Sequence, residues 1–328
     1  MFNSISRRHA LLGALALSVS ALAAAQVPAG WPAKPIRILV AYPPGGVSDN
    51  IARALADKLG AQLGTPVIVE NRAGAGGAIG MDAVAKASPD GYTLGFSSVS
   101  PLALSPHLGK LPFDPVRDIA PVAAVMVSPV VLLATSSFTG KDFASLIASS
   151  KAKPGSVRWS TSGLGTVGHI LLEQVQQTGK IEITHIPYKG GGQQLTDALS
   201  GQFEVLSTNL GGGLMQHIAA GKLRPLAIGA PASVEALPQV PTFAELGYPA
   251  ANLSSLFGVF APGKTPDALV QKINAEINRA LQTPDLRQRL VAADNVPSSG
   301  SPAEFARQIA QESQSNARII QAAHIKAE

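Results

Sequence analysis

The segment AYPPGGVSDN (residues 41–50) joins two stretches of chain with different patterns. The branched apolar run IRILVAY at 36–42 comes before it and has the composition of a buried strand. After it, apolar residues recur every four positions and form one helix face: Ile51, Leu55, Leu59 and Leu63. Further strand patterns follow at 66–71 and 92–98, with a helical pattern between them. Such an alternation with short connections predicts a parallel sheet flanked by helices.

A second alternation of strands and helices begins after the long apolar run at 121–135. Its strand patterns are VRWSTS, IEITHIPY, FEVLSTN and RPLAIGA. A return strand in SSLFGVFAPG and two closing helical patterns come too late for this second sheet. We therefore expect an α/β protein of two lobes with two crossings and a ligand cleft between the lobes. Lobe 1 would comprise residues 26–125 plus 255–328, and lobe 2 residues 126–254.

The first 25 residues are typical of an export signal. Arg7 and Arg8 give a basic start, an apolar stretch begins at Ala10, and Ala23 and Ala25 form an A-x-A-like cleavage site. The apolar stretch is too short for a lasting membrane anchor. We expect cleavage near Ala25 and a location outside the cytoplasm, reached by the Sec or the twin-arginine route.

Charge and composition argue against several classes of function. Loss of Arg7 and Arg8 from the 26 basic residues, against 21 acidic ones, leaves a net charge of +3. This small excess, without a basic cluster among aromatic residues, does not indicate nucleic-acid binding. The sequence has no cysteine, which excludes disulfides and thiolate chemistry. Trp31 and Trp159 are the two tryptophans of the chain, so a small polar anion fits better than a sugar that stacks on aromatic platforms.

Common catalytic signatures do not occur in the sequence. HExxH and G-x-S-x-G are absent, and the histidines after the signal are scattered. GLGTVG does match the dinucleotide pattern G-x-G-x-x-G through Gly163, Gly165 and Gly168. However, Glu182 falls at the start of the following strand and not at its end, where the ribose-binding acid belongs. We predict no catalytic residue, no metal and no cofactor; a periplasmic hydrolase or reductase that uses this loop is the alternative.

The glycine-rich junctions have a physical meaning without a nucleotide. A helix N-terminus presents unpaired N–H groups and a partial positive charge, and glycine lets an anion come close. In the first junction Gly45 and Gly46 expose the backbone, and Ser48 or Asp49 can cap the helix. Hydroxyl groups suited to a carboxylate surround the second junction: Ser160, Thr161, Ser162 and Thr166. Each junction alone is compatible with an ordinary tight turn, but one in each lobe favours a clamp.

Eight segments spread over nearly all of the chain after the signal carry a family resemblance. They are PPGGVSDNIAR, VENRAGAGGAIG, SPDGYTL, STSGLGTVGH, HIPYKGGGQ, GKLRPLAIGA, LPQVPTFAELG and FGVFAPGKTP. In this order they resemble the Bug family of periplasmic solute receptors, the binding components of tripartite tricarboxylate transporters. The resemblance implies a two-lobed periplasmic binding protein, type II-like, with a mostly parallel sheet flanked by helices in each lobe. It also implies a periplasmic receptor, expected to be a monomer, that delivers a small carboxylate to membrane permease subunits.

The resemblance also implies which residues hold the ligand carboxylate, partly through ordered water. In the first lobe these are Pro44, Gly45, Gly46 and Asp49. In the second lobe they are Ser160, Ser162, Gly163 and Gly165, with His169 nearby. Ser97 and Ser98, together with Tyr188 or Lys189, would line the cleft. Because neither loop contains an arginine, we expect backbone N–H and hydroxyl groups to hold the carboxylate. A receptor that feeds a signalling system is a further alternative.

Overall fold

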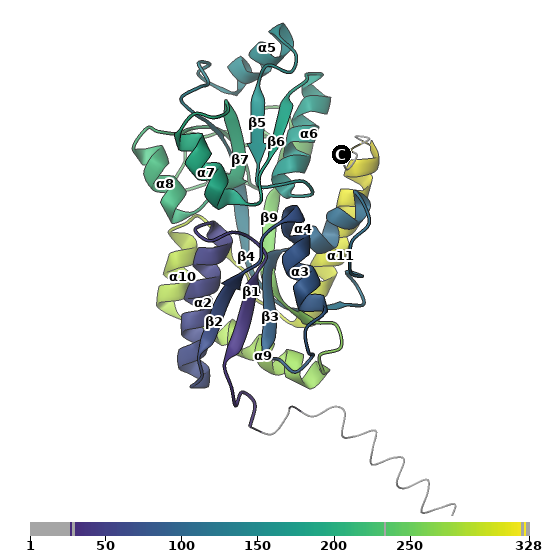
Figure 1. Cartoon of the computed structure of the whole chain (residues 1–328). Coiled ribbons are helices and arrows are strands. Elements are labelled where there is room, and N and C mark those ends of the chain that lie inside the picture. Colours follow the sequence, from purple (N-terminus) through teal and green to yellow (C-terminus); the bar gives the residue numbers. More distant parts are fainter. Residues whose placement is uncertain (1–26, 28–29, 233, 323–324, 326–328) are drawn as a thin grey trace, which may run out of the picture.

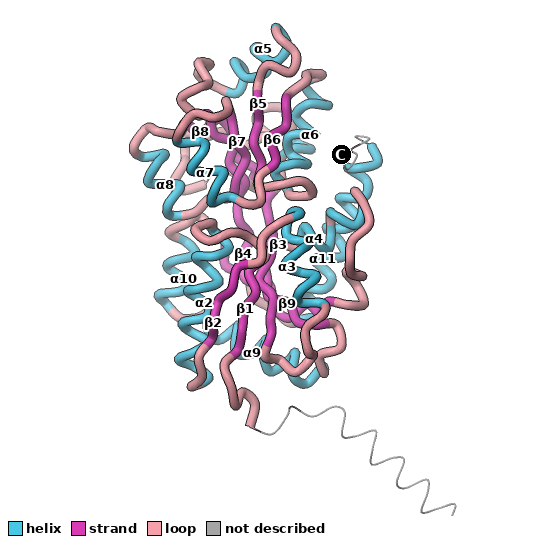
Figure 2. Tube along the Cα trace, in the orientation of Figure 1, coloured by secondary structure: helices cyan, strands magenta, loops and turns pink. Residues whose placement is uncertain are grey.

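The computed structural model describes residues 27, 30–232, 234–322 and 325 (Figure 1). The expected export signal at 1–25 lies outside the described residues. Within them, no helix is both long and apolar enough to cross a membrane. The chain forms two lobes, and the long strand β4 (Ile119–Ala134) runs from one lobe into the other (Figure 2).

The first lobe is built on a sheet with the strand order β2-β1-β3-β9-β4. Strands β1 (Ile36–Val40), β2 (Val67–Asn71) and β3 (Thr93–Ser98) are parallel. Strand β9 (Ser254–Pro262) lies antiparallel between β3 and β4. The short strand β10 (Val296–Pro297) pairs with β4 outside this order. The sheet is therefore mixed, with its antiparallel pairs where the chain returns from the second lobe.

Helices cover both faces of this sheet (Figure 1). On one face, α2 (Val47–Leu63), α9 (Asp267–Leu281) and α10 (Pro284–Val291) share an apolar core with β1, β3 and β9. On the other face, α3 (Ala78–Ala85), α4 (Ser100–Ala103) and α11 (Pro302–Ala322) pack around Phe260 and Phe305. The expected first closing helix corresponds to α9, which ends at Leu281, whereas the short helix α10, which starts at Pro284, was not predicted.

The second lobe continues from β4 in the order β4-β7-β5-β6, and β8 (Arg224–Gly229) also pairs with β4. Strands β5 (Arg158–Thr161), β6 (Thr184–Pro187) and β7 (Val205–Asn209) are parallel, and β7 is antiparallel to β4. Helices α5 (Phe143–Ala152) and α6 (Val167–Gly179) pack around Trp159. On the other face, α7 (Gly191–Leu199) and α8 (Gly212–Ala219) pack around Phe203 and Leu206. The predicted α/β architecture of two lobes is confirmed.

Candidate functional site

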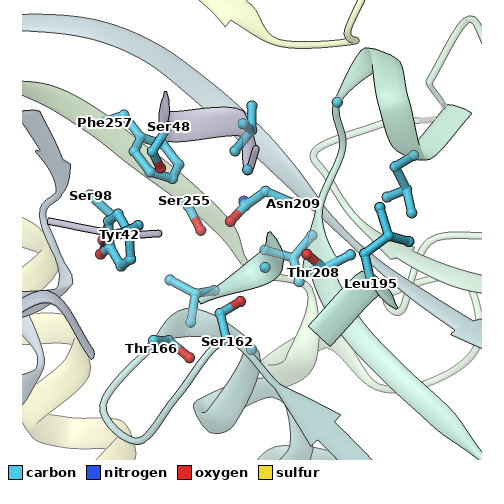
Figure 3. Close-up of a pocket in the computed structure, with 18 of the residues that line it drawn as sticks. Tyr42, Ser48, Ser98, Ser162, Thr166, Leu195, Thr208, Asn209, Ser255 and Phe257 are labelled. Carbon is cyan, nitrogen blue, oxygen red and sulfur yellow. Dashed lines mark hydrogen bonds between the residues drawn. The ribbon is translucent and has the colours of Figure 1, made fainter. Parts of the chain in front are cut away.

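A cavity of about 90 Å³ lies between the lobes, beyond the carboxyl ends of β1, β3, β5 and β7 (Figure 3). Its polar side chains are Tyr42, Ser48, Asn50, Ser98, Ser100, Ser162, Thr166, Ser207, Thr208, Asn209 and Ser255. Its apolar side chains are Pro43, Val47, Val130, Val167, Leu195, Leu214 and Phe257. A water molecule needs about 10–15 Å³ by this measure of volume. The cavity therefore has room for a small organic molecule.

Four helices, α2, α6, α7 and α8, begin at this cavity. Their N-cap residues, Gly46, Thr166, Gly190 and Gly211, make no side-chain hydrogen bond to the first turn. The first N–H groups of these helices can therefore bind a ligand, and the helix dipoles add partial positive charge. None of the described residues that line the cavity is Asp, Glu, Lys, Arg or His. The arrangement suits a small anion held by N–H and hydroxyl groups.

The first-lobe loop contributes Gly45 and Gly46 directly to the lining of the cavity. Helix α2 begins at Val47, and Gly46 is its N-cap. The helix therefore starts before Ile51, the first residue of the apolar pattern in the sequence. The expected cap by Ser48 or Asp49 is therefore wrong. Ser48 instead lies in the first turn, where it lines the cavity (Figure 3).

Asp49 holds this loop from behind and does not line the cavity. Its carboxylate accepts hydrogen bonds from the Gly45 N–H at 3.0 Å and from Asn71 Nδ2 at 2.9 Å. Arg53 Nη2 lies 2.9 Å from the same carboxylate. Burial raises the pKa of Asp49, but the hydrogen bonds from Arg53, Gly45 and Asn71 outweigh burial, and the pKa is lowered overall. Asp49 therefore fixes the shape of the loop as a buried, ionised group.

Hydroxyl groups fix the shape of the second-lobe loop. Of the residues of this loop that were predicted to bind ligand, Ser162 lines the cavity, whereas Ser160, Gly163 and Gly165 do not. The Thr166 hydroxyl donates to the Gly163 carbonyl at 2.7 Å, and Thr161 Oγ1 accepts from the Gly163 N–H at 3.2 Å. Ser160 is fully buried behind the loop, where its hydroxyl accepts a hydrogen bond from Gln194 Nε2 at 3.1 Å. These bonds leave Ser162 at the tip of the loop, facing the cavity.

The glycines of GLGTVG serve this loop and its packing. Gly163 and Gly165 have φ values of +140° and +68°, which L side chains rarely adopt. A Cβ on Gly168 would lie 2.8 Å from the hydroxyl of Ser207 on β7, so glycine at this position lets α6 approach the strand. The dinucleotide-like spacing is thereby explained by turn geometry and by helix–strand packing.

Two stacked histidines lie under the second-lobe loop. The rings of His169 on α6 and His185 on β6 are 4.7 Å apart between centroids and inclined by 9°. His169 Nδ1 accepts from the Gly165 N–H at 3.4 Å, and His185 Nε2 lies 2.7 Å from Thr161 Oγ1. The pKa of each ring is lowered to about 4, by burial for His169 and by burial together with the neighbouring His169 for His185. Both rings are therefore neutral at pH 7 and support the loop without a charge.

The remaining predicted residues lie at different depths. Ser98 lines the cavity, and its hydroxyl lies 2.6 Å from the Tyr42 hydroxyl, while Ser97 is fully buried beside it. Tyr188 donates a hydrogen bond to Asp197 at 2.6 Å and packs on Phe203, and burial together with Asp197 raises its pKa to about 12. Lys189 is exposed, and neither it nor Tyr188 is among the lining residues.

Close backbone contacts join the lobes around the cavity. A Cβ on Gly192 of α7 would lie 2.6 Å from the Pro44 carbonyl oxygen of the first lobe. In the same way, a Cβ on Gly76 would overlap the Leu164 carbonyl of the second-lobe loop. The lobes can therefore meet this closely only because these positions are glycine.

Several lining residues were not predicted from the sequence to bind ligand, namely Tyr42, Thr208, Asn209, Ser255 and Phe257. Tyr42 lies at the start of the first glycine junction. Thr208 and Asn209 lie at the carboxyl end of β7, and this position in a parallel strand was the available signal. Ser255 and Phe257 lie on β9, whose place in the centre of the sheet depends on long-range pairing.

The fold and the site together define a two-lobed solute-binding protein with a polar cavity at the lobe interface. Residues 51–325 match the model of the tripartite tricarboxylate transporter family receptor, and the chain belongs to this family. Protein BugT from Bordetella pertussis (strain Tohama I) is 38% identical, over 97% of each chain. An R. palustris protein solved with adipate is 30% identical, with a TM-score of 0.85, over 90% of this chain and 99% of that one. MatC from Rhodopseudomonas palustris with bound malate is 28% identical, with a TM-score of 0.84, over 88% of this chain and 100% of that one.

Proposed function

We propose that this receptor binds a small carboxylate in the cavity between its lobes and delivers it to the membrane permease of a tripartite tricarboxylate-type transporter. The observation that carries the proposal is the convergence of four helix N-termini without side-chain caps on one cavity. The related proteins solved with adipate and malate support a carboxylate over other anions. The protein would bind its ligand without chemical change.

The proposed contacts to the carboxylate come from both lobes. Gly46 would donate its backbone N–H group from the first lobe, where the Gly45 N–H is bound to Asp49, and Ser98 and Ser162 would contribute hydroxyl groups. Asp49, His169 and the other predicted residues that do not line the cavity would act by holding the two loops in shape. This arrangement allows a carboxylate to be held without an arginine.

The organisation and location of the mature protein belong to the same proposal. Lobe 1 would comprise residues 26–125 plus 255–328, and lobe 2 residues 126–254. The separate apolar cores on the two sides of the β4 crossing support this division. The signal at 1–25 would be removed near Ala25, and the monomeric receptor would act in the periplasm.

Titration of the purified mature protein with small carboxylates tests the function. A bound carboxylate raises the stability of the folded state by about 2.7 kcal/mol at a hundred times its dissociation constant. We expect such a rise in melting temperature, with the carboxylate recovered unchanged. Turnover of a carboxylate, or a rise with amines or sugars alone, would contradict the proposal.

The Ser162→Asp variant links binding to the cavity. A carboxylate side chain at this position repels an anionic ligand in a site without cations, so affinity should fall by about a hundredfold or more. Ser136→Asp adds the same charge at an exposed position in the second lobe and is the matched control. Equal affinities of the two variants, measured by calorimetry, would place the carboxylate elsewhere.

A further inference from the structure

The floor of the cavity carries a hydrogen-bond acceptor whose orientation is fixed by the fold. Asn209 ends β7, and its side-chain Nδ2 lies 3.3 Å from the Ser128 carbonyl and 3.5 Å from the Pro129 carbonyl of β4. An amide oxygen at this place would face two other oxygens, so this end of the amide must be the NH₂ group. The Oδ1 atom is therefore at the other end, on the side of the cavity, and accepts no hydrogen bond from the described residues.

Ser255 lies on the opposite side of β4, at the start of β9. It pairs with Ser128, two residues before Val130, which pairs with Asn209. Ser255 is 4% exposed and lines the cavity, and its hydroxyl makes no hydrogen bond to the described residues. In Figure 3 the oxygen atoms of Asn209 and Ser255 point into the same part of the cavity. Because an unpaired polar group that is buried costs free energy, the pair is suited to a polar group of a ligand.

The two side chains select the kind of polar group. Asn209 Oδ1 can only accept a hydrogen bond, so the ligand must donate one, as a hydroxyl or an ammonium group does. An ammonium group would stand among four positive helix ends with no carboxylate among the described lining residues. A hydroxyl group carries no such charge, and it can accept from the Ser255 hydroxyl while it donates to Asn209.

We propose that Asn209 and Ser255 form a recognition point for a hydroxyl group, so that the ligand of this receptor is a hydroxycarboxylate. This inference rests on the proposed function, in which the helix N-termini and the two loops hold the carboxylate. Sites that hydrogen-bond a ligand hydroxyl discriminate strongly against the analogue without it, because their own polar groups are then left unpaired. Asn209 is in this view a specificity-determining residue of the cavity.

Calorimetric titration with matched acids tests the inference. The probes are lactate with propionate, malate with succinate, and 3-hydroxybutyrate with butyrate, together with alanine and aspartate as the amino-substituted forms. In at least one pair, we expect the hydroxy acid to bind about tenfold or more tightly than its deoxy partner. The corresponding amino acid should bind no better than the deoxy acid.

Two variants assign the discrimination to these side chains. Asn209→Leu removes the acceptor, and the preference for the hydroxy acid should fall to about twofold or less. Ser255→Ala removes one hydroxyl, keeps the backbone of β9 and should weaken the preference by severalfold. Gln202→Leu makes a comparable amide-to-leucine change at an exposed position before β7 and should keep the full preference.

The outcomes separate this inference from the proposed function. If deoxy and hydroxy acids bind equally well to the unchanged protein, or the amino acids bind best, the inference is wrong and carboxylate binding stands. If none of the acids binds, the proposed function and the inference both fail. A preference that survives in Asn209→Leu would overturn the role of Asn209.

Discussion

At the scale of single residues, the side chains that shape the site are distinct from those that face it. Asp49 is 4% exposed and holds Gly45 in place through its own carboxylate, although it does not reach the cavity. The hydrogen bonds that hold the loop also stabilise the ionised form of Asp49. The fold and the site are therefore coupled through one buried charge.

We expect Asp49→Asn to destabilise the protein by about 1–3 kcal/mol, because the amide loses the pair with Arg53 and turns an NH₂ group toward donors. Since the pKa of Asp49 is lowered in the folded state, its contribution to stability is full above the unfolded pKa of about 4. It is lost as the pH falls further, toward and through the folded pKa. Urea denaturation between pH 7 and pH 3 measures both effects.

Asp82→Asn is the matched control for this change. Asp82 pairs with Lys86 on the surface of α3, and such exposed pairs contribute about 0–1 kcal/mol. Equal stabilities of the two variants would show that the hydrogen bonds of Asp49 do not hold the first-lobe loop.

The sequence indicated the glycine junctions but not the roles of the residues in them. Gly45, Gly46 and Ser162 line the cavity, as a helix N-terminus after a strand leads one to expect. Asp49 and Ser160 turn away from it, because they form hydrogen bonds with Asn71 and Gln194. These partners lie far away in the sequence, so the local pattern does not reveal them. A local pattern predicts a turn, whereas the direction of each side chain depends on contacts that the pattern does not contain.

At the scale of elements, the second-lobe loop depends on the junction between β5, β6 and α6. The neutral rings of His169 and His185 stack beneath the loop and reach its Gly165 N–H and Thr161 hydroxyl. The Glu173 carboxylate lies 3.7 Å from His169 Nε2. Two imidazolium rings in this stack would repel each other and lose one hydrogen-bond acceptor.

This stack predicts a loss of stability in acid. The unfolded histidines titrate near pH 6.5 and the folded ones near pH 4, so the neutral pair stabilises the fold fully above pH 6.5 and progressively less toward pH 4. Between pH 7.5 and pH 4.5 the two rings should account for up to about 5 kcal/mol of lost stability. Urea denaturation at the two pH values measures this loss.

The double variant with His169→Gln and His185→Gln should lose less stability over the same interval, because glutamine does not titrate. Carboxylates elsewhere titrate in both proteins, and their effect cancels in the comparison. His217→Gln on α8 lies outside the stack and serves as the control. An identical pH dependence of the double variant and the unchanged protein would contradict the assignment.

At the scale of the whole molecule, the lobes meet beside the cavity at backbone groups that leave no space for a side chain. Gly192 faces the Pro44 carbonyl across the interface, and Gly76 faces Leu164. These contacts surround the cavity and would form as the lobes close on a ligand. Closure of the lobes therefore depends on glycine at these two positions as well as on the contacts to the ligand.

We expect Gly192→Ala to weaken carboxylate binding by about tenfold or more, because its Cβ would lie 2.6 Å from the Pro44 oxygen in this arrangement. The ligand-free protein should be as stable as before or more stable, since alanine favours the helix by up to about 1 kcal/mol. Calorimetry and urea denaturation give the two values separately.

Gly60→Ala in α2 is the control for Gly192→Ala. Its Cβ would meet the Thr65 carbonyl at 3.4 Å, an ordinary contact, and it lies away from the lobe interface. This variant should gain helix stability with unchanged affinity. If Gly192→Ala behaves in the same way, the contact with Pro44 is not part of the ligand-bound form.

The order of the strands in the first lobe also has a consequence for how the protein is made. Strand β9 lies between β3 and β4, and Pro262 pairs with Ile119, although the whole second lobe separates them in the chain. During folding, β3 therefore keeps one unpaired edge until β9, which ends at Pro262, pairs with it. The strands of the second lobe come from one continuous stretch of chain that begins in β4, so they can pair before β9 is in place. Pairings between distant segments form slowly, and unpaired strand edges favour aggregation. The insertion of β9 is therefore the folding step at which a chaperone would act on this chain.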